Sequence, residues 1–486
     1  MTEGPAFAGV RYSSAAGRWV LAATVLGSGI AALDATVVNV ALPAIGTDLG
    51  SDVAGLEWVL TGYLLTLASL ILLGGSLGDR YGRKRVFLAG VAWFSAASLL
   101  CGLAPNLGAL IAARLLQGIG GALLTPSSLA IIEATFVSDD RAKAIGAWSG
   151  YGGVATAIGP FAGGWLISTV SWRLVFLLNL PLAALVVYAC RHVPETSDPW
   201  ADRHLDVGGA VLGALGLAGL TYGLIEQTVA PGLAGLVVLV VFVVVERRAR
   251  APMVPPGIFA SVAFYAANVF TLVIYAALGV TFFLVAVELQ QALHYSPTAA
   301  GAALLPITLL MLTLSARAGA LAQRIGPRVP MTVGPLLVAT GFALMWRIEP
   351  GAAYASAVLP AVVVVGCGLA LTVAPLTATV LAAASEEHAG VASGINNAVA
   401  RVGGLLAVAV VPAAAGVTGR VYLDPVALTD GFHEAMTISA VLVVIGAAIA
   451  ALTMSGRALH PDVVSDDRHC CIDAPPLRRP ARASAA

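Results

Sequence analysis

The sequence predicts an all-α, polytopic membrane protein, and three observations carry this prediction. Of its 486 residues, 59% are hydrophobic and only 11% are charged, whereas a soluble globular protein contains about 25% charged residues. The apolar residues gather in runs of about 20, which is the length that one helix needs to cross a bilayer. Arginines and lysines are also concentrated in alternate connecting segments, as is typical of membrane proteins.

Fourteen apolar runs are long enough to be membrane spans. They lie near residues 18–41, 55–77, 86–104, 109–133, 143–167, 172–191, 206–226, 230–246, 263–289, 297–320, 329–346, 355–380, 390–416 and 433–455. Because many others follow the first run, we expect it to be a span and not a cleavable signal. The chain is therefore predicted to be a multi-pass protein of the cell membrane.

The distribution of basic residues predicts the orientation of these spans. If the N-terminus is cytoplasmic, the inside segments hold 20 arginines and lysines, and the outside loops hold only Arg173, Arg347 and Arg420. Cytoplasmic loops carry such an excess of basic residues. Both termini are therefore predicted to be cytoplasmic.

An internal repeat predicts how the spans are grouped. Residues 75–86 align without a gap with residues 319–330, and both segments are expected after the second span of a six-span set. Repeats of this kind form the two halves of transporters that rock around a site at the middle of the membrane. We predict a cytoplasmic tail (1–17), two six-helix bundles (18–191 and 263–456), a linker with two additional transmembrane helices (192–262) and a disordered cytoplasmic tail (457–486).

Five sequence motifs occur in order along the chain. They are LDATVVNVALP at 33–43, GGSLGDRYGRKR at 74–85, RLLQGIGG at 114–121, GGVATAIGPFAGG at 152–164 and WRLVFLLNLP at 172–181. With these motifs nearly the whole chain resembles the major facilitator superfamily, and within it the fourteen-span drug:proton antiporters. The resemblance implies a secondary transporter that exports lipophilic or cationic organic compounds, such as antibiotics, in exchange for protons by alternating access.

The second motif contains a candidate conformational latch. Gly78 and Gly82 allow a tight turn at the membrane face, and Asp79 and Arg83 have the spacing of an ion pair on one helix face. The resemblance implies that this cluster latches the two halves in the outward-facing state, with Glu133 as a third charged member. The alternative is that these basic residues only follow the positive-inside rule. The second copy has Gln323 in place of Asp79, so we expect any latch there to be weaker.

The fifth span carries small residues at helical spacing. Gly152, Thr156, Pro160 and Gly164 are four residues apart, and Gly159 belongs to the same motif. Small residues allow two helices to approach closely, and proline favours a kink. The resemblance implies an antiporter signature that packs at the interface between the halves. The alternative is an ordinary packing seam without a role in coupling.

Four charged residues within the predicted spans are candidates for proton coupling or substrate contact: Asp34, Arg114, Glu288 and Arg401. A charged side chain deep in a span costs about 2.5–3.5 kcal/mol on insertion scales, so it needs a partner or a function. A carboxyl group in a poorly hydrated cavity can take up a proton near neutral pH, and it can also attract an organic cation.

Each of these charged residues also has a structural alternative. Asp34 can form a static ion pair with Arg114, Glu288 can reach the outer headgroups, and Arg401 can serve structural pairing. The polar residues Asn39, Gln117, Gln290 and Asn397 can line a central cavity or form hydrogen bonds between helices, which is the commoner use.

Several function classes are disfavoured by the sequence. It contains no phosphate-cradling loop, metal cluster or catalytic triad, so we expect no cofactor, no ATP and no enzymatic activity. A formal net charge of zero argues against nucleic acid as a partner. The expected partners are a small-molecule substrate, protons and membrane lipid. The alternatives are an importer or uniporter of a small metabolite and, outside transport, a membrane receptor or enzyme. Cys470 and Cys471 lie in the polar tail with too few ligands to predict a metal site.

Overall fold

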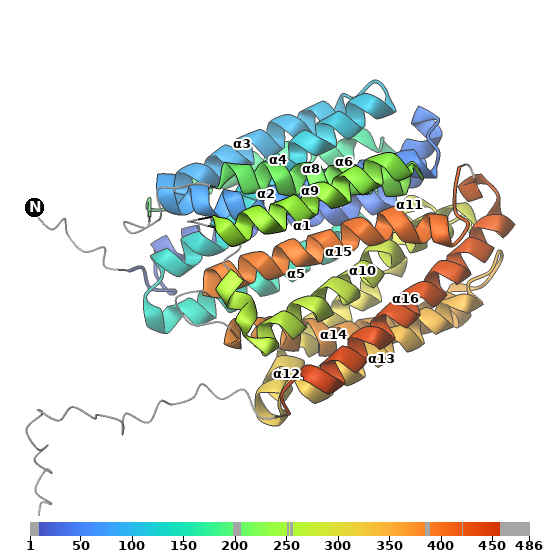
Figure 1. Ribbon diagram of the computed structural model, residues 1–486. Coiled ribbons are helices and arrows are strands. Elements are labelled where there is room, and N and C mark those ends of the chain that lie inside the picture. Colours follow the sequence, from blue (N-terminus) through green and yellow to red (C-terminus); the bar gives the residue numbers. More distant parts are fainter. Residues whose placement is uncertain are drawn as a thin grey trace, which may run out of the picture.

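The computed structural model describes residues 9–197, 206–249, 252, 256–383, 389–419 and 421–456. Long helices make up nearly all of this part of the chain and run back and forth through one bundle (Figure 1). The β-pairing found in it is a single isolated bridge between Val10 and Phe136. The all-α membrane fold predicted from the sequence is confirmed. The predicted C-terminal tail, with Cys470 and Cys471, lies outside the described residues.

The N-terminal half is built from the first six predicted spans. Its helices are α1 (Ala15–Leu49), α2 (Val53–Tyr81), α3 (Arg83–Gly102), α4 (Leu107–Thr135), α5 (Ser138–Thr169), α6 (Arg173–Leu177) and α7 (Asn179–Cys190). Ser14, Asp52 and Asn106 cap the starts of α1, α2 and α4 with side-chain oxygens, which satisfies backbone N–H groups left free at a helix start. The sixth span is divided at Leu178 into α6 and α7, which the sequence did not predict.

Two further helices follow, and then the C-terminal half. The additional pair is α8 (Val207–Ile225) and α9 (Val229–Arg248). The second half contains η1 (Pro256–Ala260), α10 (Val262–Gln291), α11 (Pro297–Ala303), α12 (Leu305–Ile325), α13 (Arg328–Leu344), η2 (Met345–Arg347), η3 (Tyr354–Val358), α14 (Leu359–Ala382), α15 (Ala389–Ala414), η5 (Val421–Leu423) and α16 (Pro425–Thr453). Helix α8 packs on α9 and contacts both α2 and α15, so it touches the two halves at once.

Thirteen segments of the described chain are long and apolar enough to cross a membrane. The fifth predicted span, 143–167, is not among them. It coincides with α5, a helix of 32 residues that is rich in glycine and packs against α1 and α11. Glycine and polar residues lower the hydropathy of α5, whereas its length and its place in the bundle match those of the neighbouring helices.

The internal repeat appears as the same sharp corner in both halves. Gly82 lies between α2 and α3 with a φ of 107°, and Gly326 lies between α12 and α13 with a φ of 85°. Both angles fall in the left-handed region that favours glycine, because a Cβ atom is strained there. The two corners therefore depend on the glycines that the sequence alignment places opposite each other.

The two halves meet tightly at the end of the bundle that the basic residues assign to the outside. A side chain at Gly164 of α5 would overlap the backbone of Pro297, and one at Gly301 of α11 would overlap the backbone of Pro160. Gln290 also donates from Nε2 to the carbonyl oxygen of Val40 across the halves at 2.9 Å.

The cytoplasmic half of α5 contacts α1. Trp148 donates from Nε1 to Ser28 Oγ at 2.8 Å, and Ala144 is fully buried. A Cβ atom added at Gly146 or Gly152 would meet no described atom within 4 Å. The contacts of α5 with the second half, at Pro160 and Gly164, therefore lie toward its outer end.

Candidate functional site

A cavity of about 430 Å³ lies between the two halves. Its volume falls in the range of small-molecule sites, about 300–1,000 Å³. Most lining residues are apolar, and the lining comes from α1, α2, α4, α5, α10, α11, α12, α14 and α15. The lining residues that are polar, charged or tyrosine are Thr36, Asn39, Tyr63, Arg114, Tyr275, Thr308 and Arg401. None of the described residues in this lining is an aspartate or glutamate.

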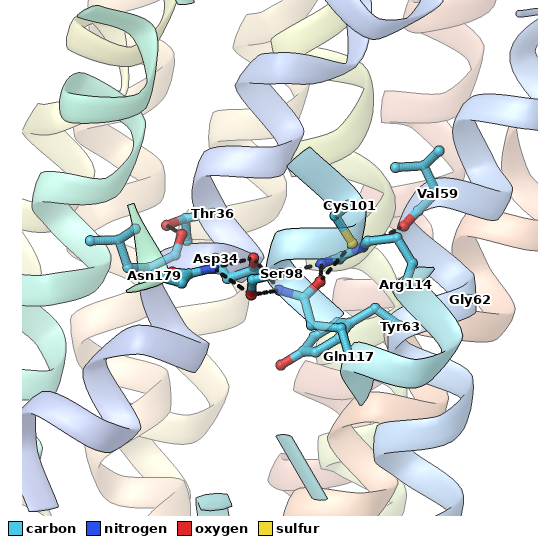
Figure 2. A network of polar contacts seen from close by, with 12 residues as sticks. Asp34, Thr36, Val59, Gly62, Tyr63, Ser98, Cys101, Arg114, Gln117 and Asn179 are labelled. Atoms are coloured by element: carbon cyan, nitrogen blue, oxygen red, sulfur yellow. Dashed lines mark hydrogen bonds and ion pairs between the residues drawn. The ribbon is translucent and has the colours of Figure 1, made fainter. Parts of the chain in front are cut away.

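A buried ion pair lies beside this cavity. Arg114 donates from Nη1 to Oδ2 of Asp34 at 2.6 Å, and the two side chains are 1% and 0% exposed. Arg114 also donates from Nε to the carbonyl oxygen of Val59 at 2.9 Å. The structure thus brings together the two charged residues of the first half that the sequence singled out (Figure 2).

Polar side chains from three helices complete the coordination of Asp34. Its Oδ1 atom accepts hydrogen bonds from Gln117 Nε2 at 2.8 Å and from Asn179 Nδ2 at 3.1 Å. Both amides also donate to Ser98 Oγ. Figure 2 shows these residues around one carboxylate. Each Asp34 oxygen therefore has partners, as an ionised carboxylate away from water requires.

Arg114 connects the buried ion pair to the cavity. Its guanidinium lies 4.5 Å from the ring centroid of Tyr63, a cation–π distance. Arg114 and Tyr63 both line the cavity, whereas Asp34 does not. Arg114 therefore joins the buried carboxylate of Asp34 to the cavity wall.

Arg401 lies in the cavity wall contributed by α15. Tyr63 of the first half and Tyr275 of the second lie within electrostatic reach of its charge. Within the described residues, its guanidinium has no hydrogen bond or ion pair, unlike that of Arg114. The predicted alternative of structural pairing is therefore not seen for Arg401.

Glu288 is buried inside the second half. It is 0% exposed, and its Oε1 atom accepts a hydrogen bond from Thr429 Oγ1 at 2.6 Å. Its Oε2 atom has no partner among the described residues. The side chain therefore lies between α10 and α16, away from the cavity lining. It does not reach the surface, so the alternative that Glu288 contacts the outer lipid headgroups is wrong.

The four polar cavity candidates occupy different environments. Asn39 lines the cavity. Gln117 belongs to the Asp34 network, and Gln290 joins the two halves at their outer ends. Asn397 is exposed and donates to Ser393 O of its own helix. Of the four, only Asn39 lines the cavity. Gln117 and Gln290 instead make hydrogen bonds between helices, which was the alternative prediction.

The candidate latch residues are paired with each other. Arg83 approaches Oδ1 of Asp79 with both Nε and Nη2 at 2.8 Å, while Gly78 lies near Ser127 of α4. Glu133 is close enough to Arg83 and Asp79 for electrostatic interaction. In the part of the chain that the structure describes, these contacts all lie within the first half.

The segment after α7 also holds this loop in place. Lys84 donates from Nζ to Val193 O at 2.7 Å, and its backbone N–H donates to Glu195 Oε1 at 3.0 Å. The sequence did not predict this contact between the loop and the linker.

The last part of the α5 motif is closely packed. Gly159 lies against Thr36 of α1, and Pro160 and Gly164 lie against α11. A Cβ atom added at Gly152 would meet no described atom within 4 Å. The side chain of Thr156 lies outside the described residues.

Sequence reasoning missed four residues of the site: Tyr63, Ser98, Asn179 and Tyr275. Asn179 is a polar residue inside the apolar run of the WRLVFLLNLP motif, so its position alone was a signal. Ser98 and the two tyrosines give no such signal, because serine and tyrosine are common in membrane helices.

Comparisons with known proteins agree with this architecture. The family model described as Major Facilitator Superfamily matches residues 24–408. The chain is 35% identical over 386 residues to a puromycin resistance protein of Streptomyces alboniger, covering 76% of each protein. It is 36% identical over 382 residues to a tetracenomycin C resistance and export protein of Streptomyces glaucescens, covering 76% of this chain and 70% of the relative.

Solved structures show the same fold. The inward-facing, unoccupied bacterial homolog of the human lysosomal transporter Spinster superposes with a TM-score of 0.66 at 18% identity, covering 91% of this chain and 97% of that one. A structure from a study of proton-dependent oligopeptide transporters gives a TM-score of 0.67 at 14% identity, covering 90% and 98%. With the family model matching most of its length, this chain belongs to the major facilitator superfamily.

Proposed function

We propose that this protein is a secondary transporter that exports small lipophilic organic compounds, including antibiotics, in exchange for protons. The observation that carries the proposal is the apolar cavity between the two halves, with the Arg114–Asp34 pair at its wall. The names of the resistance and export relatives support the direction of transport. Membership of a transporter superfamily also argues against an enzyme or a receptor.

The contacts between the halves support alternating access. The outer ends are joined at Gly164 with Pro297 and at Gln290 with Val40. Rocking of the two halves around the cavity would separate the outer contacts and expose the cavity to the outside. We infer that the ion pair of Asp79 and Arg83, at the cytoplasmic end of α2 and α3, latches that outward-facing state.

Proton coupling is proposed to occur at Asp34. The ionised carboxylate accepts from Arg114, Gln117 and Asn179. A proton on Asp34 removes the charge that holds Arg114 and turns one acceptor into a donor, so the network must rearrange. Because Arg114 lies in the cavity wall, uptake of a proton from the outside changes what the cavity offers to its substrate.

The charge of the lining bears on the substrate. The sequence predicts lipophilic or cationic compounds, with cations attracted by Asp34. In the structure Asp34 is fully buried behind Arg114, and the described lining contains no carboxylate. The cavity therefore supports lipophilic compounds more directly than cations.

The experiment compares drug susceptibility in a host that lacks its own exporters, with and without this protein, followed by transport in energised inside-out vesicles. We expect raised resistance to at least one lipophilic antibiotic and accumulation in vesicles that stops when a protonophore removes the pH gradient. Increased sensitivity to the compounds would indicate an importer. Accumulation that is never uphill would indicate a uniporter.

A further inference from the structure

We propose that the cavity selects lipophilic organic acids and that Arg401 binds their acidic group. This inference rests on the proposed function, because it takes the cavity between the halves as the transport site. It adds the chemical class of the substrate and the residue that recognises it.

The charge balance of the cavity is the first step. Two arginines line it, and the described lining contains no acidic residue. The charge of Arg114 is matched by Asp34 at 2.6 Å, whereas Arg401 has no hydrogen bond or ion pair within the described residues. The cavity therefore carries one uncompensated positive charge.

The location of that charge is the second step. Arg401 lies at mid-length of α15, a membrane-spanning helix. A charged side chain inside a membrane is unfavourable unless it is paired or faces a water-filled cavity. An anionic substrate entering the cavity would supply the missing partner. An organic cation would meet a positive charge and find no carboxylate in the lining.

The shape of the cavity supplies the rest of the recognition. Phe282, Leu278 and Leu304 belong to an apolar wall that can take up the hydrocarbon part of a ligand. The tyrosines Tyr63 and Tyr275, near Arg401, can donate hydrogen bonds to an acidic head group. A guanidinium binds a carboxylate with two parallel hydrogen bonds. The ligand that fits all three features is an amphipathic acid with an aromatic or aliphatic body.

Export is the energetically favourable direction for a negatively charged substrate. An organic acid is ionised at cytoplasmic pH, and the membrane potential, negative inside, favours outward movement of an anion. Exchange of one anion for one proton moves two positive charges inward. Both the potential and the pH gradient therefore drive export.

The test measures binding of three probes that share one hydrocarbon body: pyrenebutyrate, pyrenebutanol and a pyrenebutyl trimethylammonium salt. Each is titrated into the full-length protein in lipid nanodiscs, with energy transfer from tryptophan to pyrene as the signal and empty nanodiscs as the blank. We expect pyrenebutyrate to bind at least about tenfold tighter than the alcohol, because hydrogen bonds to charged groups contribute more than neutral ones, and the ammonium salt to bind most weakly.

Variants assign the preference to one residue. Arg401→Gln should weaken binding of pyrenebutyrate by about 10- to 100-fold and change binding of the alcohol by less than about twofold, while Arg401→Lys should keep part of the preference. The matched control is Arg317→Gln, which removes an exposed arginine of the same half from α12, outside the lining; it should leave all three affinities unchanged.

Two results would overturn the inference: a wild-type protein that binds the alcohol or the ammonium salt as tightly as the acid, or an Arg401→Gln variant that keeps the preference. If Arg401→Gln does not fold, the wild-type comparison and Arg401→Lys still decide. Vesicle transport separates this failure from that of the proposed function. Gradient-driven transport of an antibiotic without any preference for the acid refutes only the inference, and absence of all gradient-driven transport refutes both.

Discussion

The buried pair of Asp34 and Arg114 gives the sharpest prediction, because its two proposed roles differ in a measurable way. Asp34→Asn keeps the shape of the side chain and removes its charge. The new amide has only one acceptor oxygen. If that oxygen accepts from Gln117 and Asn179, the NH2 group faces Arg114, and if the oxygen faces Arg114, the NH2 group faces the two amide donors. Removing one partner of a buried ion pair costs about 3–5 kcal/mol. Arg114 keeps its bond to Val59 O and its contact with Tyr63, so we expect the lower end of that range.

The assay combines thermal unfolding of purified protein with uphill efflux in vesicles under an imposed pH gradient. If Asp34 couples transport to protons, Asp34→Asn loses uphill transport, Asp34→Glu keeps part of it because a titratable group remains, and Arg114→Gln does not restore it to Asp34→Asn. If the pair is only structural, the double variant Asp34→Asn with Arg114→Gln recovers both stability and uphill transport. Wild-type uphill transport by Asp34→Asn would refute coupling at this residue, and Glu288 would be the next residue to test.

Three further predictions follow from the packing and the charges. Asp79→Asn should slow vesicle transport without reducing the amount of protein in the membrane, because it breaks the ion pair with Arg83, and the matched Gln323→Ala should have little effect; an unchanged rate for Asp79→Asn would contradict the latch. Gly164→Val should disrupt the outer closure, because its side chain would overlap Pro297. A disulfide between cysteines at Ser168 and Thr298, whose hydroxyl oxygens are 2.9 Å apart, should then form less readily, whereas Gly152→Val, whose Cβ atom would meet no described atom within 4 Å, should leave it unchanged; equal crosslinking in both variants would argue against the closure. A cysteine at the exposed Thr47 should react with an impermeant thiol reagent added outside, and one at the exposed Tyr81 only from the cytoplasmic side; the reverse labelling would invert the predicted orientation.

The helices of the fold were largely predicted from the sequence, and their interruptions were not predicted. Apolar runs of about 20 residues specify membrane helices almost by themselves, because the bilayer offers the backbone no other hydrogen-bond partners. The breaks at Leu178 and Leu304 divide two of these runs. Pro181 and Pro306 follow these breaks within three residues, and a proline has no N–H to donate to the carbonyl four residues earlier. The sequence therefore held a signal for both breaks that the span prediction did not use.

The site was predictable only in part. The pairing of Asp34 with Arg114 could be predicted, because charged residues inside membrane spans usually pair with residues of opposite charge. Ser98 could not be added to them, because a lone serine in an apolar run does not indicate which helix it faces. The sequence also could not predict that Arg401 is unpaired within the described residues, because this depends on every side chain around the cavity and not on the arginine itself.

The arrangement of the two arginines suggests why both halves are needed. Asp34 and Arg114 belong to the first half, and Arg401 belongs to the second. Tyr63 is near both arginines, because its ring centroid lies 4.5 Å from the Arg114 guanidinium and its hydroxyl is within electrostatic reach of Arg401. In the mechanism that we propose, a proton on Asp34 would act on this tyrosine through Arg114, and an acidic substrate would act on it through Arg401. Because the halves move relative to each other during alternating access, a proton-sensitive group in one and a substrate-binding group in the other can be coupled through the motion that separates them.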